Sequence, residues 1–135
     1  MTNAVYSKAK EKMLQAGIDL VTGDVKAILV DTLNYYVDLE NHDFLDDIPV
    51  VAITATSPVL TNKSIAGGVF DADNITFTLV SGNESEAIIL YIDTGTESES
   101  PLIAYIDTAT GLPITPNGGD IVIEWDNGAN KIFRL

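Results

Sequence analysis

A series of about eight short strand-like segments, together with the short lead-in at residues 69–70, is spaced at roughly ten residues and restricts the fold more than any other feature. Each segment is rich in β-branched or alternating apolar residues and is bounded by Gly, Pro, Asn or Asp. The segments are residues 25–30, 50–56, 59–65, 69–70, 75–80, 87–92, 102–106, 121–125 and 131–135. This spacing is typical of an antiparallel β-sandwich or a jelly-roll-like barrel, so we predict a mainly β fold.

The first residues carry a helical pattern instead. Thr2 or Asn3 can cap a helix that runs to about Gln15, and Gly17 can end it by taking a positive φ. One narrow apolar stripe recurs at spacings of three and four residues, formed by Val5, Ala9, Met13 and Ala16. A helix this short must dock on another part of the protein to be stable.

Local turn signals divide the rest of the chain. Asn41 or Asp43 can cap a single helical turn, which Pro49 ends because the residue before proline disfavours helix. Gly67-Gly68 predicts a turn, and Asn127-Gly128 predicts a hairpin between the last two strands.

Composition indicates one domain with a real core. The chain has 135 residues, of which 46% are hydrophobic and 20% charged, and it has no cysteine. Disulfides, thiolate metal sites and cysteine nucleophiles are therefore excluded. We see no leader-like segment and no apolar run of membrane-spanning length. We predict a helical segment, residues 1–16, followed by a single β domain, residues 17–135.

The charge is unevenly distributed. The net charge is −13, but the first 12 residues hold Lys8, Lys10 and Lys12 against one acid, Glu11. The remainder is strongly acidic, which disfavours binding to nucleic acid through this body and keeps copies of it apart. The basic start could reach an acidic surface on a neighbour or could be a solvated helix face.

Two similar segments end in Asp-Thr. Residues 89–96 read Ile-Leu-Tyr-Ile-Asp-Thr-Gly-Thr, and residues 103–110 read Ile-Ala-Tyr-Ile-Asp-Thr-Ala-Thr. The first matches the Asp-Thr-Gly signature of aspartic proteases, which need two carboxylates that share a proton. A homodimer could supply the second carboxylate. However, Ala109 replaces the turn glycine in the second copy, and the spacing suits two strands of one hairpin that each end in an Asp-Thr turn.

Other chemistry has weaker support. Asp71, Asp73 and Asn74, and separately Asp43, Asp46 and Asp47, offer oxygen ligands for weak calcium binding, but neither set matches an EF-hand loop. Solvated turns and capping carboxylates are the alternative. His42 is the only histidine, which rules out a multi-histidine metal site, and no Gly-x-Ser-x-Gly segment accompanies it. We expect no cofactor and no enzymatic activity.

Three segments resemble small virion structural proteins of tailed bacteriophages. They are His-Asp-Phe-Leu-Asp-Asp-Ile-Pro (42–49), Gly-Val-Phe-Asp-Ala-Asp-Asn-Ile-Thr-Phe (68–77) and the stretch from Thr110 to Leu135. The resemblance extends over almost the whole chain and is most specific at the C-terminal segment. Size, acidity and β content are also similar to capsid decoration, or cement, proteins. The resemblance implies a protein that binds outside the major capsid shell, often as a dimer or trimer, and carries no catalytic residues.

The sequence therefore predicts a capsid decoration protein of a phage particle. Its expected partners are the major capsid protein and copies of itself, with no nucleic acid and no membrane. Expected contact residues are Tyr6, Lys8, Lys10, Lys12 and Phe44, together with an apolar C-terminal strand and a helix that looks detachable.

Two alternatives remain. One is a tail or head–tail joining protein. The other is a carbohydrate-binding β-sandwich that would use exposed aromatics drawn from Tyr35, Tyr36, Tyr91, Tyr105 and Trp125.

Overall fold

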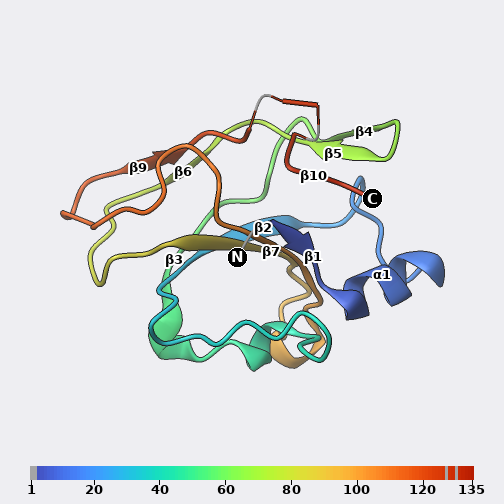
Figure 1. Ribbon diagram of the computed structural model, residues 1–135, viewed down its shortest axis with the longest axis horizontal. Helices are drawn as coiled ribbons and strands as arrows, with labels where there is room; N and C mark the ends of the chain where they lie inside the picture. Colours follow the sequence, from blue (N-terminus) through green and yellow to red (C-terminus); the bar gives the residue numbers. More distant parts are fainter. Residues whose placement is uncertain (1–2, 127, 130) are drawn as a thin grey trace.

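A computed structural model describes residues 3–126, 128–129 and 131–135 of the chain. In these residues ten β-strands form three antiparallel sheets, joined by one short α-helix and three 3-10 turns (Figure 1). The predicted mainly β fold is confirmed. The strands of the described residues make open sheets and do not close into a barrel.

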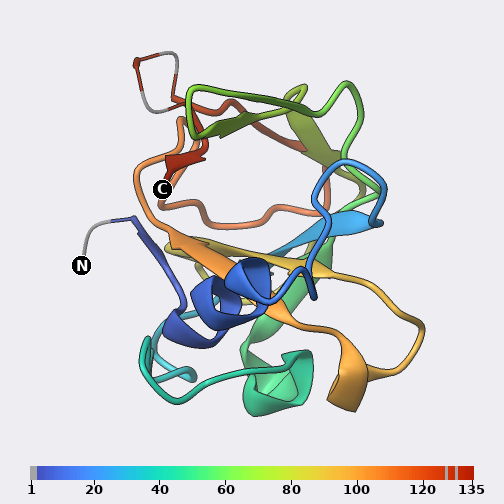
Figure 2. The same ribbon diagram turned by 90° about the vertical axis from the view of Figure 1, so that its right-hand side faces the viewer.

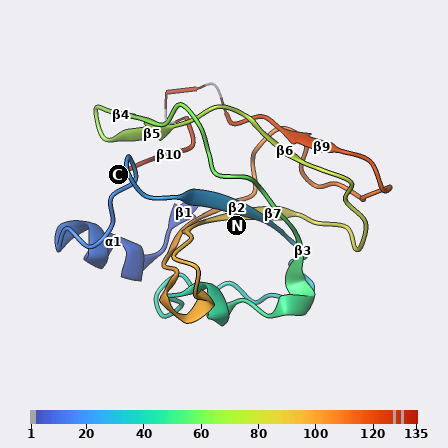
Figure 3. The ribbon, with the colours of Figure 1, turned by 180° about the vertical axis from the view of Figure 1, so that it is seen from behind.

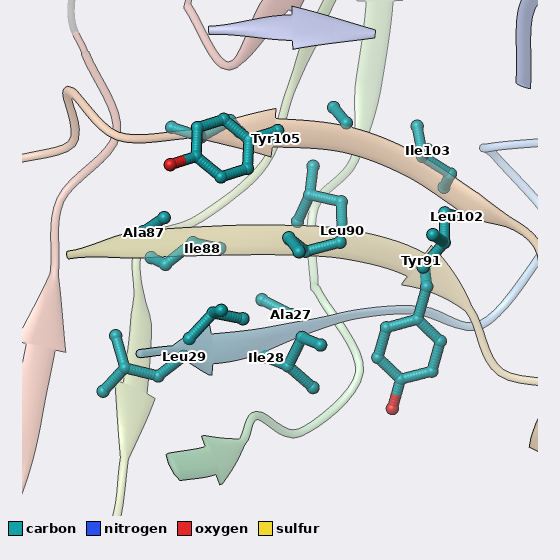
Figure 4. Packing of buried hydrophobic residues seen from close by; sticks show 14 of the residues in the cluster. Ala27, Ile28, Leu29, Ala87, Ile88, Leu90, Tyr91, Leu102, Ile103 and Tyr105 are labelled. Carbon is teal, nitrogen blue, oxygen red and sulfur yellow. The ribbon is translucent and has the colours of Figure 1, made fainter. Parts of the chain in front are cut away.

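The largest sheet has five strands in the order β1-β8-β7-β2-β3. These strands are β1 (Ala4–Val5), β8 (Leu102–Ile106), β7 (Ala87–Ile92), β2 (Val25–Val30) and β3 (Ile53–Thr56). The three central strands are almost continuous apolar runs because they are buried on both faces (Figure 4). Their bounds match the predicted segments.

Two smaller sheets lie on one side of the large sheet (Figures 1 and 3). They are formed by β4 (Ser64–Ala66), β5 (Val69–Asp71) and β10 (Phe133–Arg134), and by β6 (Ile75–Phe77) and β9 (Ile121–Ile123). The other side is covered by the chain that carries three 3-10 turns. These turns are η1 (Leu45–Asp47), η2 (Val50–Ala52) and η3 (Glu97–Glu99).

The hairpin between β4 and β5 shows the predicted glycine turn. Gly67 and Gly68 have φ angles of 59° and 77°, and Ala66 pairs with Val69 directly across the turn. Two consecutive positive φ values match the twist of the flanking strands, which explains the glycine pair.

The N-terminal prediction needs correction. The helix α1 (Ser7–Leu14) begins later than predicted, since Val5 lies in β1 and Tyr6 is the capping residue without a side-chain cap. Asn3 instead accepts a hydrogen bond from the Asp107 amide at 2.9 Å, which ties the start of the chain to the end of β8. Thr2 lies outside the described residues.

The helix end also differs from the prediction. Ala16, rather than Gly17, takes the positive φ, at 59°. The Gly17 amide then donates to the Lys12 carbonyl at 2.7 Å and the Ala16 amide to the Met13 carbonyl at 3.2 Å. This paired closure satisfies two carbonyls that the last helical turn leaves without partners.

The predicted helical turn is a 3-10 turn, and the side chain that caps its start belongs to its last residue, Asp47. Asp47 accepts hydrogen bonds from the amides of Asp43 and Phe44, at 2.7 and 3.2 Å. Asn41 or Asp43 was predicted as the cap, but the carboxylate that reaches these amides belongs to Asp47, three residues after the capping residue Phe44. Pro49 follows the turn as predicted.

The predicted hairpin between the last two strands is wrong. β9 pairs with β6, and β10 pairs with β5. Phe133 packs on Phe70 with ring centroids 5.4 Å apart, and Ile123 is buried opposite Ile75. Burial of these side chains in different sheets outweighs the local turn signal of Asn127-Gly128, of which Asn127 lies outside the described residues.

Candidate interaction surfaces

One face of α1 is fastened to the rest of the chain. Lys12 forms an ion pair with Asp43, and its ammonium lies 4.6 Å from the centre of the Phe44 ring. The Ser7 amide donates to the Leu39 carbonyl at 2.8 Å. We call this side, with Tyr6 and Lys12, the inner face. It joins α1 to residues 35–44, so the helix is docked rather than detached.

Tyr6 adds a buried hydrogen-bond chain to the inner face. Its side chain is 0% exposed, and its hydroxyl lies 2.9 Å from the hydroxyl of Tyr35, which lies 2.7 Å from Nδ1 of His42. Burial raises the pKa of Tyr6 far above its usual range and raises the pKa of Tyr35 to about 12.

Three of the predicted contact residues therefore serve the fold. Tyr6 cannot contact a partner in this conformation because it is enclosed by its own chain. Lys12 and Phe44 contact each other. Lys8 is partly exposed and lies 3.4 Å from Glu11, one helical turn away. Lys10 is exposed and forms no ion pair within the described residues.

The opposite face of α1 borders an apolar groove. Leu14 is 89% exposed, Leu135 is 63% exposed, and a hollow of about 590 Å³ lies beside them. The residues that line it come from β1, α1 and the end of the chain: Asn3, Ala4, Val5, Lys10, Met13, Leu14, Arg134 and Leu135. Figure 2 looks onto α1 and shows β10 above it, on the side where both chain ends lie.

Two further hollows extend this groove. A hollow of about 450 Å³ shares Met13 and Leu135 and continues to Phe133 and Ile65. A smaller one of about 190 Å³ lies between β1 and β10. Since β1 and β10 are edge strands of their sheets, the groove follows two strand edges. We call the eight residues of the largest hollow the groove.

A second exposed apolar surface lies on the segment before β3. Val50 is 75% exposed and Val51 72% exposed, and the exposed Asp46 precedes them. The loop that bears the exposed Leu33 joins this segment, because the Asp31 amide donates to the Ala52 carbonyl at 2.9 Å. We call Leu33, Asp46, Val50 and Val51 the acidic lobe.

Asp31 holds the base of the acidic lobe. This buried carboxylate accepts hydrogen bonds from the Leu33 amide at 3.0 Å, from Asn34 at 2.8 Å and from Asn83 at 3.0 Å. Burial alone would raise its pKa, but the three hydrogen bonds outweigh burial, so the pKa of Asp31 is lowered. The carboxylate therefore stays ionised and fixes the loop that carries Leu33.

The two Asp-Thr segments end at opposite ends of two neighbouring strands. β7 and β8 are antiparallel neighbours, as their spacing predicted, with Ile88 opposite Ile106 and Tyr91 opposite Leu102. Asp93 and Asp107 therefore cannot share a proton within one chain. Asp93 accepts from Lys26 at 2.7 Å and from the Gly95 amide at 2.9 Å, and the Lys26 hydrogen bond is the main cause of its lowered pKa.

Several of the candidate calcium ligands have partners within the chain. Asp43 is paired with Lys12, Asp47 caps η1, and Asp73 accepts from Asn62 at 2.6 Å. Within the described residues no group of three or more His, Asp or Glu side chains is arranged to hold a metal ion.

The aromatic residues do not form one exposed face. Tyr35, Tyr91, Tyr105 and Trp125 are buried, and the Trp125 indole N–H donates to the Asp73 carbonyl at 3.0 Å. Tyr36 is 88% exposed. The stacking surface that a carbohydrate-binding sandwich would use is therefore not assembled from these five side chains.

The sequence analysis did not single out Arg134 or Leu14 as surface residues, whereas Leu135 belongs to the apolar C-terminal strand that was expected at a contact. Leu14 lies outside the predicted apolar stripe, and that departure was the one signal available.

Comparison with protein-family models finds no match, and comparison with curated proteins finds none either. No helix in the part of the chain that the structure describes has the length and apolar character to cross a membrane.

Proposed function

We propose that this protein is a non-enzymatic structural component of a bacteriophage particle, and that it decorates the capsid by binding the major capsid protein. We interpret the packing of the two smaller sheets on the large sheet as a β-sandwich. We propose that the protein acts in the virion. The observation that carries this proposal is exposed apolar surface at two places, the groove and the acidic lobe, on a body whose net charge is −13.

Physical chemistry supports such a role. Exposed apolar surface beside charged residues is typical of a protein-binding site, since burial of the apolar part supplies free energy and the charges set the register. The central core is built from apolar side chains of the chain itself, and the strongly acidic body favours solubility at high copy number. The resemblance of residues 110–135 to phage virion proteins is the reason for proposing a phage particle.

A tail or head–tail joining protein could use the same groove, so the experiment must separate the two locations. Purified protein is mixed with empty capsids that lack it and, separately, with isolated tails, and each mixture is sedimented. We expect saturable co-sedimentation with capsids only. Co-sedimentation with tails only would favour the tail alternative. Protein that stays in the supernatant in both mixtures, or that binds a glycan array, would overturn the proposal.

A further inference from the structure

We propose that the groove binds the acidic lobe of a second copy of this chain, so that copies associate head to tail. The inference rests on the proposed function only in treating the protein as one that assembles, and it names the partner of the same groove.

The groove requires an occupant that is both apolar and acidic. Lys10 and Arg134 both line it, and neither has an ion pair within the described residues. By contrast, Lys8, Lys12 and Lys26 each lie beside a carboxylate of their own chain. Apolar side chains fill the rest of the lining, so an occupant with charges alone would leave that surface in contact with water.

The acidic lobe has this chemistry. Val50 and Val51 project from η2, and the Asp46 side chain forms neither a hydrogen bond nor an ion pair with any described residue. Burial of two valine side chains against Leu14 and Leu135 would remove apolar surface from water on both partners. Asp46 would place a carboxylate beside Lys10 and Arg134, neither of which has an ion pair within the described residues.

The two surfaces cannot meet within one copy. The groove follows β1, at one edge of the five-stranded sheet, and the acidic lobe leads into β3, at the opposite edge. Figures 1 and 3 show α1 and β10 at one end of the molecule and the turn before β3 at the other. Contact between different surfaces of identical chains is heterologous and produces rings or open chains.

Charge favours a contact at the groove over contacts between acidic surfaces. Two bodies of net charge −13 repel one another in most orientations. The groove combines exposed apolar surface with two cations, so a neighbouring copy meets less repulsion there than at a purely acidic surface and can bury apolar side chains. The register of association is therefore set by the same residues that supply its free energy.

The test is a charge exchange measured by sedimentation velocity over a range of protein concentrations. We expect wild-type protein to associate as concentration rises, and K10E to weaken association by about tenfold, or about 1.4 kcal/mol. L14D and V50D should have at least that effect. The double variant K10E/D46K should recover association because the two charges are exchanged across the contact.

Two matched controls accompany these variants. K8E makes the same charge change on the same helix outside the groove, and L79D makes the same polar change at another exposed leucine. Both should associate like the wild type. Circular dichroism and thermal unfolding verify that each variant is folded, which is expected because the changed side chains are exposed or only partly buried.

Several results would overturn the inference. They are wild-type protein that stays monomeric at every concentration, K8E as weak as K10E, V50D without effect, or no recovery in K10E/D46K. Capsid sedimentation gives a separate result, so the two proposals fail independently. Self-association without capsid binding refutes decoration alone, and capsid binding by a strictly monomeric protein refutes docking of a second copy.

Discussion

The two faces of α1 differ in what they contact, although they belong to one eight-residue helix. The inner face is held by buried and part-buried contacts, through Tyr6 and through Lys12. The outer face presents Lys10 and the exposed Leu14 beside the groove. A short helix needs tertiary contacts to persist, and one face supplies them here, which leaves the other available for a partner.

Because the two faces differ, we expect the stability of the fold and the association of copies to depend on different residues of α1. Changes on the inner face should lower the free energy of unfolding, whereas changes on the outer face should alter association and leave the fold intact. The basic residues of this segment, which look equivalent in the sequence, therefore have different roles according to the face on which they lie.

The largest effect is expected at Tyr6. Replacement by alanine removes a fully buried ring and leaves the Tyr35 hydroxyl without one of its partners, so Y6A should lower the free energy of unfolding by about 3–5 kcal/mol. Urea unfolding measures the change. The control Y36A removes an exposed ring and should shift stability by less than about 0.5 kcal/mol. Equal losses in the two variants would show that the inner face is not docked.

The second-largest effect is expected from alkaline pH, which should lower the free energy of unfolding through the tyrosines of the inner face. Burial disfavours the phenolate, so the pKa of Tyr35 is raised from 10.0 to about 12, and that of Tyr6 is raised further. A group whose pKa is higher in the folded state stabilises the fold below its unfolded pKa, and this stability is lost as pH rises through the folded value. The free energy of unfolding should therefore fall from about pH 10 to pH 12 and beyond.

The double variant Y6F/Y35F provides the comparison for this alkaline loss. It should show a smaller fall in the free energy of unfolding over the same pH range. Part of the fall should persist, because burial also raises the pKa of Tyr91 and Tyr105. An identical alkaline loss in the variant and the wild type would contradict the role given to Tyr6 and Tyr35.

The Lys12 contacts should contribute less. K12M keeps the aliphatic stem but removes the ion pair with Asp43 and the cation over Phe44, which should cost about 1 kcal/mol. Chemical unfolding of K12M, D43N and the double variant forms a cycle that isolates the pair. Strictly additive losses would mean that Lys12 and Asp43 do not interact in solution.

The outer face should give the smallest effect on stability. K10E and K8E should each change the free energy of unfolding by less than about 0.5 kcal/mol, because both side chains are exposed or partly exposed. Only K10E should alter association. A large loss of stability in K10E would place Lys10 in the fold rather than at a contact.

Central strands could be read from the sequence because their apolar runs are bounded by turn residues on both sides. The bounds of β2, β7 and β8 all match, and the β4–β5 turn follows from two glycines. The partners of β9 and β10 could not be read from the sequence, since these strands pair with β6 and β5, around Ile75 and Phe70, which are distant in the sequence. Local turn chemistry does not encode which sheet buries a strand.

The interaction surface was only partly predictable. Lys10 was expected at a partner from the charge pattern, and it is exposed beside the groove. Tyr6, Lys12 and Phe44 were expected at a partner too, and they contact their own chain. A basic or aromatic residue looks the same in a sequence whether its partner lies within the chain or outside it. Arg134 and Leu135 reach the groove only because β10 pairs with β5 and ends beside α1.

Amide hydrogen exchange, recorded on dilute and concentrated wild-type protein, tests the two-faced role of α1 most directly. In dilute protein the amides of residues 10–14 should exchange slowly, as in a docked helix. At high concentration, protection should increase at residues 3–5, 10–14 and 131–135 and at residues 45–52, with little change at residues 35–42. Rapid exchange of the helix in dilute protein, or equal protection at both concentrations, would contradict this account.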